Sequence, residues 1–252
     1  MASLITLLTD FGTADGYVAE MKGVLLTLAP GATIVDVTHD VAPQDVECGR
    51  LALARYWRRF PAGTVHVAVV DPGVGSERAA LAVASDGRFL VGPDNGLLSP
   101  ALLFRGARAV SLPASPAAAP TFHGRDVFAP AAAALAGGAT LESLGAPLDS
   151  PIVRRTSEPR RLADGGIEGE VITIDRFGNA VTNCLGLRGG SIEVAGTSLP
   201  LRRTYADTPS GSPTALVGSS GLIEIAVRDG SAARELGLAR GARVVFRPGS
   251  AP

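Results

Sequence analysis

A change of pattern partway along this 252-residue chain constrains the fold most strongly. Up to about Gly145, short apolar runs rich in β-forming residues alternate with segments that carry apolar side chains at helical spacing. The predicted strands span 3–9, 33–37 and 64–70, a predicted hairpin spans 79–85 and 88–92, and the predicted helices span 15–28, 45–58, 95–103 and 126–136. Apolar strands separated by helices predict a largely parallel sheet that is covered on both faces.

The remainder of the chain carries almost no helical signal. The stretch 145–166 contains three prolines and little periodicity, which is typical of a linker or a long surface loop. Beyond it, short β-type runs are separated by Gly, Pro and Ser, which predicts a small all-β barrel or sandwich. We therefore predict an α/β fold class, with a mostly parallel α/β domain at 1–150, a linker at 151–165 and a C-terminal β-barrel domain at 166–252.

Composition excludes several classes of partner. The net charge is −1 and like charges form no block, which argues against nucleic acid or an anionic membrane as the main partner. No apolar run reaches the length of a membrane span, and the apolar N-terminus lacks a basic region. Cys48 and Cys184 match no metal-ligand spacing and are expected to be buried thiols. We expect a cytoplasmic protein.

Polar residues gather where three predicted strands end. The first strand leads into Asp10 and continues to Asp15, the second into His39 and Asp40, and the third into the run 71–78. Because ligands of parallel sheets bind at the carboxyl ends of the strands, we expect these residues to share a pocket mouth. Its carboxylates favour a cationic or hydroxyl-rich ligand.

Each of these side chains also has a purely structural interpretation. Asp15 is a natural N-cap for the helix that follows, and Asp71, before Pro-Gly, is a typical turn residue. Arg78 fits a solvated strand edge, and His123 fits a local hydrogen bond at a helix start. None of the residues decides the function alone.

Five separated motifs, in collinear order, carry a family resemblance. They are TDFGTADGYVAEMKGV at 9–24, VDPGVGSER at 70–78, PDNGLL at 93–98, FHGRDVFAP at 122–130 and IDRFGNAVTN at 174–183. Together they resemble the SAM hydroxide adenosyltransferase family (SAM hydrolases, DUF62), which is related to fluorinase and chlorinase. The resemblance runs from the first strand to about residue 235.

The resemblance implies a homotrimer whose sites lie between the N-terminal domain of one subunit and the C-terminal domain of its neighbour. It also implies substrate-binding roles for seven residues. Asp10 is expected at the ribose hydroxyls, Asp15 at the methionine end, Asp175 at the amino group and Ser219 at the carboxylate. Phe177 and Tyr205 are expected at the two faces of adenine, and Asn179 at its edge. Two positions depart from the halogenases. Ser220 stands where they use an Arg, and Gln44 stands where fluorinase has a Trp.

Three positions imply that the nucleophile is water. Asp71 replaces a hydroxyl-bearing residue of the halogenases, which also lack the pair Arg78 and His123. The implied reaction is attack of water or hydroxide on the ribose C5′ of S-adenosyl-L-methionine (SAM), giving adenosine and L-methionine. The sulfonium leaves as a neutral thioether, so the reaction requires neither a general acid nor a metal or other cofactor. Any of the three residues remains a candidate for the base.

Two other functions remain open from the sequence. One is a sensor that binds adenosine or SAM with little turnover. The other is a metal-dependent hydrolase that uses Asp10, His39, Asp40 and His123.

Overall fold

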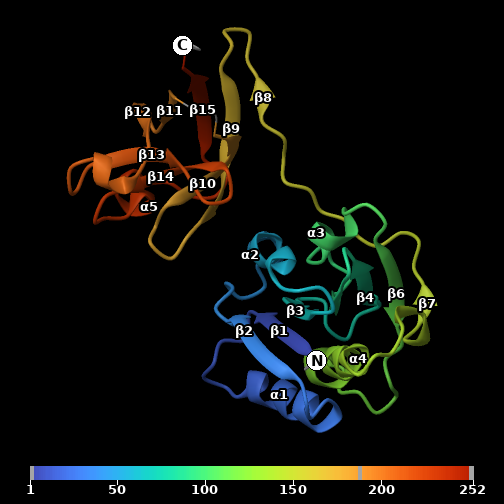
Figure 1. Ribbon diagram of the computed structural model, residues 1–252. Coiled ribbons are helices and arrows are strands. Elements are labelled where there is room, and N and C mark those ends of the chain that lie inside the picture. Colours follow the sequence, from blue (N-terminus) through green and yellow to red (C-terminus); the bar gives the residue numbers. More distant parts are fainter. Residues whose placement is uncertain (1–2, 187–188, 250–252) are drawn as a thin grey trace. The chain divides into compact units, whose positions relative to one another are not determined.

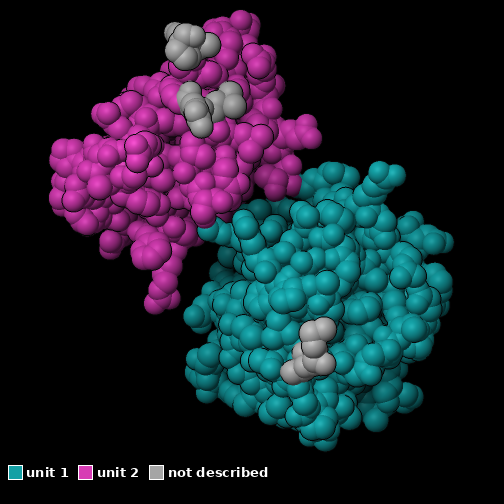
Figure 2. Space-filling model, in the orientation of Figure 1, with its two compact units in different colours: residues 1–155 teal, residues 156–252 magenta. Residues whose placement is uncertain are grey.

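The computed structural model describes residues 3–186 and 189–249. The chain divides into two compact units, residues 1–155 and 156–252, coloured separately in Figure 2. Within the described residues, no helix has the length and apolar character needed to cross a membrane.

Unit 1 is built on a seven-stranded sheet with strand order β2-β1-β3-β5-β4-β6-β7. The strands are β1 (Leu4–Thr9), β2 (Thr33–Thr38), β3 (Val65–Val69), β4 (Ala80–Ser85), β5 (Arg88–Pro93), β6 (Arg108–Leu112) and β7 (Ala146–Pro147). The pairs β2–β1, β1–β3 and β3–β5 are parallel, whereas β4, β6 and β7 add antiparallel pairs at the other edge. The predicted parallel-rich sheet is therefore confirmed.

Helices cover both faces of this sheet (Figure 1). One apolar core joins the strands to α1 (Tyr17–Leu28) and α4 (Ala129–Ala136), through buried residues such as Met21 and Leu135. The other core joins them to α2 (Val46–Tyr56) and α3 (Ser99–Leu102), through residues such as Leu53. Alternate strand residues supply the two cores, as the period of two in a strand requires.

Several boundaries differ from the prediction. The helix predicted at 95–103 shrinks to α3, because the Asn95 side chain caps a turn by donating to the carbonyl of Val70 and accepting from the amide of Leu97. The helix predicted at 126–136 begins with a π-helical turn at Gly124–Phe128. The N-cap interpretation of Asp15 is wrong, since Gly16 (φ 81°) occupies that position.

Unit 2 is a closed seven-stranded barrel, which confirms the predicted barrel fold. Its strands are β9 (Ile167–Ile174), β10 (Ala180–Leu185), β11 (Gly190–Val194), β12 (Thr197–Arg202), β13 (Pro213–Val217), β14 (Leu222–Val227) and β15 (Arg243–Pro248). They follow the order β10-β14-β13-β12-β11-β15-β9, and pairing of β9 with β10 closes the ring. The short β8 (Arg160–Arg161) pairs antiparallel with β9, and α5 (Ala232–Glu235) follows β14.

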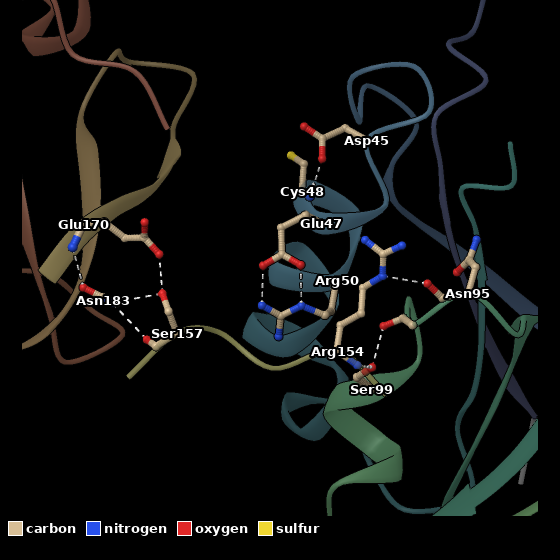
Figure 3. A network of polar contacts seen from close by, with 11 residues as sticks. Asp45, Glu47, Cys48, Arg50, Asn95, Ser99, Arg154, Ser157, Glu170 and Asn183 are labelled. Carbon is tan, nitrogen blue, oxygen red and sulfur yellow. Dashed lines mark hydrogen bonds and ion pairs between the residues drawn. The ribbon is translucent and has the colours of Figure 1, made fainter. Parts of the chain in front are cut away.

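Hydrogen bonds hold the segment between the sheet and the barrel at both of its ends (Figure 3). On the unit 1 side, the amide of Arg154 donates to Ser99 Oγ at 2.8 Å, and its Nε donates to the carbonyl of Asn95 at 2.9 Å. On the unit 2 side, Asn183 Nδ2 donates to the carbonyl of Ser157 at 2.9 Å. Residues 154–157, which lie within the predicted linker at 151–165, are thus hydrogen-bonded to unit 1 at one end and to unit 2 at the other. We call them the bonded segment.

Candidate active site in unit 1 and a second pocket in unit 2

The order β2-β1-β3 brings the three predicted polar strand ends to the same edge of the sheet. The loop after β3 folds back so that Asp71 and Arg78 face one another. Arg78 Nε donates to Asp71 Oδ1 at 2.9 Å, and Nη2 donates to Oδ2 in a second, shorter bond. The Asp71 side chain is 4% exposed and that of Arg78 is 9% exposed, so this ion pair is withdrawn from solvent.

His123 completes a chain of three residues. Its Nδ1 lies 2.9 Å from Arg78 Nη2. Because a guanidinium can only donate, Nδ1 must accept, and a neutral His123 must then carry its proton on Nε2. Partial burial and the neighbouring Arg78 both lower the pKa of His123, so the neutral ring is the favoured form near pH 7.

Close backbone contact joins the two loops that carry these residues. Gly75 has φ 77°, and a Cβ at this position would lie 2.5 Å from the carbonyl oxygen of Pro120. Only glycine satisfies both requirements without strain. The Gly75 contact therefore holds the 119–123 segment against the loop after β3, which brings His123 to Arg78.

Asp71 and His123 open onto a pocket of about 450 Å³. Its wall contains three aromatic rings, Phe11, Tyr17 and Phe122, which meet edge to face with centroids 5.3 to 6.1 Å apart. These rings lie inside the sequence motifs, but the sequence analysis gave them no role. The pocket lining therefore combines these rings with Asp71 and His123 and with a second charged pair, Arg125 and Glu20, whose side chains lie 2.7 Å apart.

Arg78 is not part of this pocket lining, and neither are the other unit 1 candidates. Asp10 Oδ2 accepts the amide of Gln44 at 2.7 Å, and Asp15 is exposed. His39 is buried, with Nδ1 2.8 Å from Thr9 Oγ1 and Nε2 3.1 Å from Asp36 Oδ1. Among the described residues, no group of three or more His, Cys, Asp and Glu side chains could hold a metal ion.

A second pocket, of about 640 Å³, lies in unit 2 and is lined by Phe177, Asn179 and Tyr205. Asp175 shapes the loop before β10. Its Oδ1 accepts the amides of Phe177 and Asn179, each at 2.9 Å, and its Oδ2 accepts Asn179 Nδ2 at 3.1 Å. Phe177 is 76% exposed and Tyr205 is 41% exposed, so both rings offer a face to a ligand.

Ser219 is exposed and does not line this pocket, so the structure does not bring it together with the aromatic pair. Arg228, Asp229 and Arg234 do line it, and the sequence analysis missed all three. Asp229 adopts φ 58°, a left-handed conformation that is uncommon for a non-glycine residue and marks a tight turn at the pocket. In the sequence, the run Arg228-Asp229-Gly230 after an apolar strand indicates a turn with charged side chains at this position.

These features define a class of protein, in which an α/β unit carries a buried, hydrogen-bonded polar chain and a β-barrel unit carries a pocket lined by two exposed aromatic rings. The family model for the SAM hydroxide adenosyltransferase N-terminal domain matches residues 5–145, and that for the C-terminal domain matches residues 169–245. The chain belongs to the SAM hydroxide adenosyltransferase family, as its motifs predict.

Individual relatives agree with this assignment. An (R)-S-adenosyl-L-methionine hydrolase of Thermus thermophilus is 47% identical over 248 residues, which cover 93% of this chain and 95% of the relative. A fluorinase of Actinoplanes sp. is 31% identical, over 88% of this chain and 90% of the relative. The crystal structure of an uncharacterized conserved protein from Thermotoga maritima has a TM-score of 0.87 and 31% identity, and covers 96% of this chain and 99% of that one.

Proposed function

We propose that this protein hydrolyses SAM to adenosine and L-methionine. The observation that carries the proposal is the hydrogen-bonded chain Asp71–Arg78–His123, whose two ends, Asp71 and His123, line the unit 1 pocket. Such a chain suits activation of an oxygen nucleophile. Membership of the family and the 47% identity to a protein named as a SAM hydrolase support it. Asp71, Arg78 and His123 are the proposed catalytic residues.

The geometry suits hydroxide as the nucleophile. The guanidinium of Arg78 is a positive charge next to the pocket-lining residues Asp71 and His123, and the Nε2–H of His123 is a hydrogen-bond donor, so both groups favour an anion over neutral water. In water the pKa of the nucleophile is about 15.7, and such donors lower it. The proton is released to solvent, and His123, with Nδ1 engaged by Arg78 and Nε2 already protonated, acts as a donor and not as the base.

The bonds balance without a cofactor. The hydroxide oxygen bonds to C5′ while the C5′–S bond breaks, and the electron pair stays on the sulfur of methionine as a neutral thioether. Asp71 holds the guanidinium in place through two hydrogen bonds and balances its charge. Orientation of the two reactants contributes further, because good positioning is worth about 7–11 kcal/mol at its best.

We assign substrate binding to seven residues on the strength of the family motifs. They are Asp10, Asp15, Asp175, Phe177, Asn179, Tyr205 and Ser219. The exposed faces of Phe177 and Tyr205 suit stacking on adenine, and Asn179 suits its edge. We also propose a cytoplasmic homotrimer in which each site combines the unit 1 pocket of one subunit with the unit 2 pocket of its neighbour.

The direct test is to incubate purified protein with SAM and to quantify adenosine and methionine by chromatography at several pH values. We expect both products in equal amounts, with a rate that rises with pH as hydroxide forms. Added fluoride or chloride should give no halogenated nucleoside. Adenosine at the uncatalysed background level would contradict the proposal, and tight retention of adenosine with negligible turnover would instead indicate a sensor.

Mixing two variants tests the shared sites. Arg78→Ala damages the unit 1 pocket, and the double variant Phe177→Ala/Tyr205→Ala damages the unit 2 pocket. If sites combine halves from two subunits, co-refolding the variants should restore activity to a fraction of the wild-type level. No recovery in trimers shown by light scattering to be mixed would exclude the arrangement.

A further inference from the structure

Glu224 is a buried carboxylate that the reaction described above does not use. It lies on β14, where Ile223, Ile225 and Val227 face the barrel core, so the alternation of the strand turns Glu224 to the outer surface of the barrel. Glu224 is nevertheless only 6% exposed. A carboxylate buried on a strand's outer face must be covered by other parts of the chain and needs a hydrogen-bond donor.

Tyr205 supplies that donor. Its hydroxyl donates to Glu224 Oε2 at 3.0 Å. Burial, and then the adjacent Glu224 carboxylate, raise the pKa of Tyr205 to about 12, so the phenol keeps its proton and remains a donor at neutral pH. The short helical turn Tyr205–Asp207, which carries the ring, is thereby attached to β14.

The same carboxylate lies against the turn that joins β13 and β14. A Cβ on Gly218 would collide with Glu224 Oε1 and Cδ, so the side chain folds directly over this turn. Gly218 immediately precedes Ser219. Glu224 therefore contacts two separate elements, one carrying the ring of Tyr205 and the other carrying Ser219.

We infer that Glu224 is a positioning residue for substrate recognition, and that it holds the Tyr205 ring and the Gly218 turn in their ligand-binding places. This inference rests on the proposed function, which assigns Tyr205 and Ser219 to the substrate. Glu224 does not line the unit 2 pocket, so it acts through other residues such as Tyr205, which does. Its effect is on the affinity for the nucleoside and not on the attack at C5′.

Four variants test the inference by steady-state kinetics with SAM and by calorimetric titration with adenosine. Glu224→Leu removes the acceptor, Glu224→Gln keeps it, Tyr205→Phe removes the donor, and the fourth variant combines Tyr205→Phe with Glu224→Leu. We expect Glu224→Leu to raise KM and the adenosine Kd about tenfold, as for a lost hydrogen bond to a charged group, with kcat nearly unchanged. Glu224→Gln should restore most of the affinity.

The double variant separates positioning from general damage. If Glu224 acts partly through the Tyr205 hydroxyl, the two single losses should not add, because they remove the same bond. Thr182→Val is the matched control, since Thr182 is fully buried and its hydroxyl donates to the carbonyl of Ile223, on the strand that carries Glu224. This control should lower thermal stability without changing KM.

Three results would overturn the inference. They are an unchanged KM and Kd in Glu224→Leu, a Gln variant as weak as the Leu variant, or fully additive losses in the double variant. The adenosine titration needs no turnover, so a wild-type protein that binds adenosine without hydrolysing SAM fails the proposed function but still tests Glu224. A wild-type protein that binds neither ligand contradicts both.

Discussion

The two pockets differ in how their polar groups are held. In unit 1, Asp71, Arg78 and His123 are bonded to one another and the Asp71–Arg78 pair is nearly inaccessible to solvent. In unit 2, Phe177 and Tyr205 present open ring faces, and the hydrogen bonds lie behind them, in the loop around Asp175 and at Glu224. Groups that stabilise charge act best when preorganised away from water, whereas faces that stack on a ligand must be open before it arrives. The difference supports the proposed function, in which the first pocket supplies the chemistry and the second supplies recognition.

Arg78→Lys should show the largest effect. Lysine keeps the charge but cannot make the paired bonds to Asp71 or hold Nδ1 of His123 in the same geometry. We expect kcat to fall by about 10²–10³-fold, as for loss of an oxyanion-stabilising donor, with little change in the Kd for SAM. Single-turnover kinetics and calorimetry measure the two quantities.

Arg88→Lys is the control for this substitution, because Arg88 belongs to the same sheet and pairs with Asp86. It should leave kcat unchanged. If Arg78→Lys weakened binding and spared kcat, the assignment of chemistry to unit 1 would be wrong.

Acid should destabilise unit 1 before unit 2, since all three histidines lie in unit 1. His66 is fully buried with Nδ1 2.7 Å from Thr6 Oγ1, and burial lowers its pKa to about 4 from the ordinary 6.5. Between these values the unfolded chain binds a proton that the folded protein does not, so stability falls as pH falls from 6.5 to 4. The expected loss is about 3 kcal/mol.

Urea unfolding at pH 7, 5.5 and 4.5 measures this loss, and hydrogen exchange locates it. In His66→Gln the slope over this window should largely disappear. Equal loss of protection in the barrel and the sheet would contradict the prediction.

Gly75→Ala should damage the alignment of the two unit 1 loops. The positive φ and the contact with the Pro120 carbonyl together should cost about 2 kcal/mol of stability and move His123 away from Arg78. The midpoint temperature of thermal unfolding and kcat should both fall. Gly63→Ala, which has φ 83° but no neighbour within 4 Å, isolates the backbone contribution, and an equal effect on kcat from Gly63→Ala would exclude the alignment role.

Phe177→Ala should have the smallest effect and the opposite kinetic pattern. Loss of one stacking face should raise KM about tenfold and leave kcat nearly unchanged. Stability should not change, because the ring is 76% exposed. Phe177→Tyr keeps an aromatic ring for stacking and should have a KM close to that of the wild type. A fall in kcat for Phe177→Ala would contradict the distinction between the two pockets.

Much of this arrangement is readable from the sequence because it depends on period and strand order. Apolar runs mark β1, β2 and β3, and the rule for parallel sheets then gathers Asp10, Asp71 and their neighbours at one edge. β10 carries a weaker strand signal because Thr182 and Asn183 interrupt its apolar run, although Thr182 is buried and bonds to the carbonyl of Ile223. The helix at 95–103 was overextended because a side-chain cap on the turn leaves no mark in the hydrophobic pattern.

The relations between side chains were not readable. Assigning His123 as a donor needs the distance from Nδ1 to Arg78, and recognising Glu224 needs the bond to Tyr205, nineteen positions away in the sequence. An isolated Glu in an apolar strand carries no signal of its partner. The sequence therefore identifies the candidate residues, and the distances between their side chains are needed to propose what each one does.

The bonded segment between the units has a consequence for how such proteins diversify. Arg154 bonds only to groups of unit 1 in the contacts described above, and Ser157 only to groups of unit 2. A junction near residues 155 and 156 would leave both sets of bonds intact. Recombination at this junction would therefore exchange whole units between relatives and leave both sets of hydrogen bonds in place.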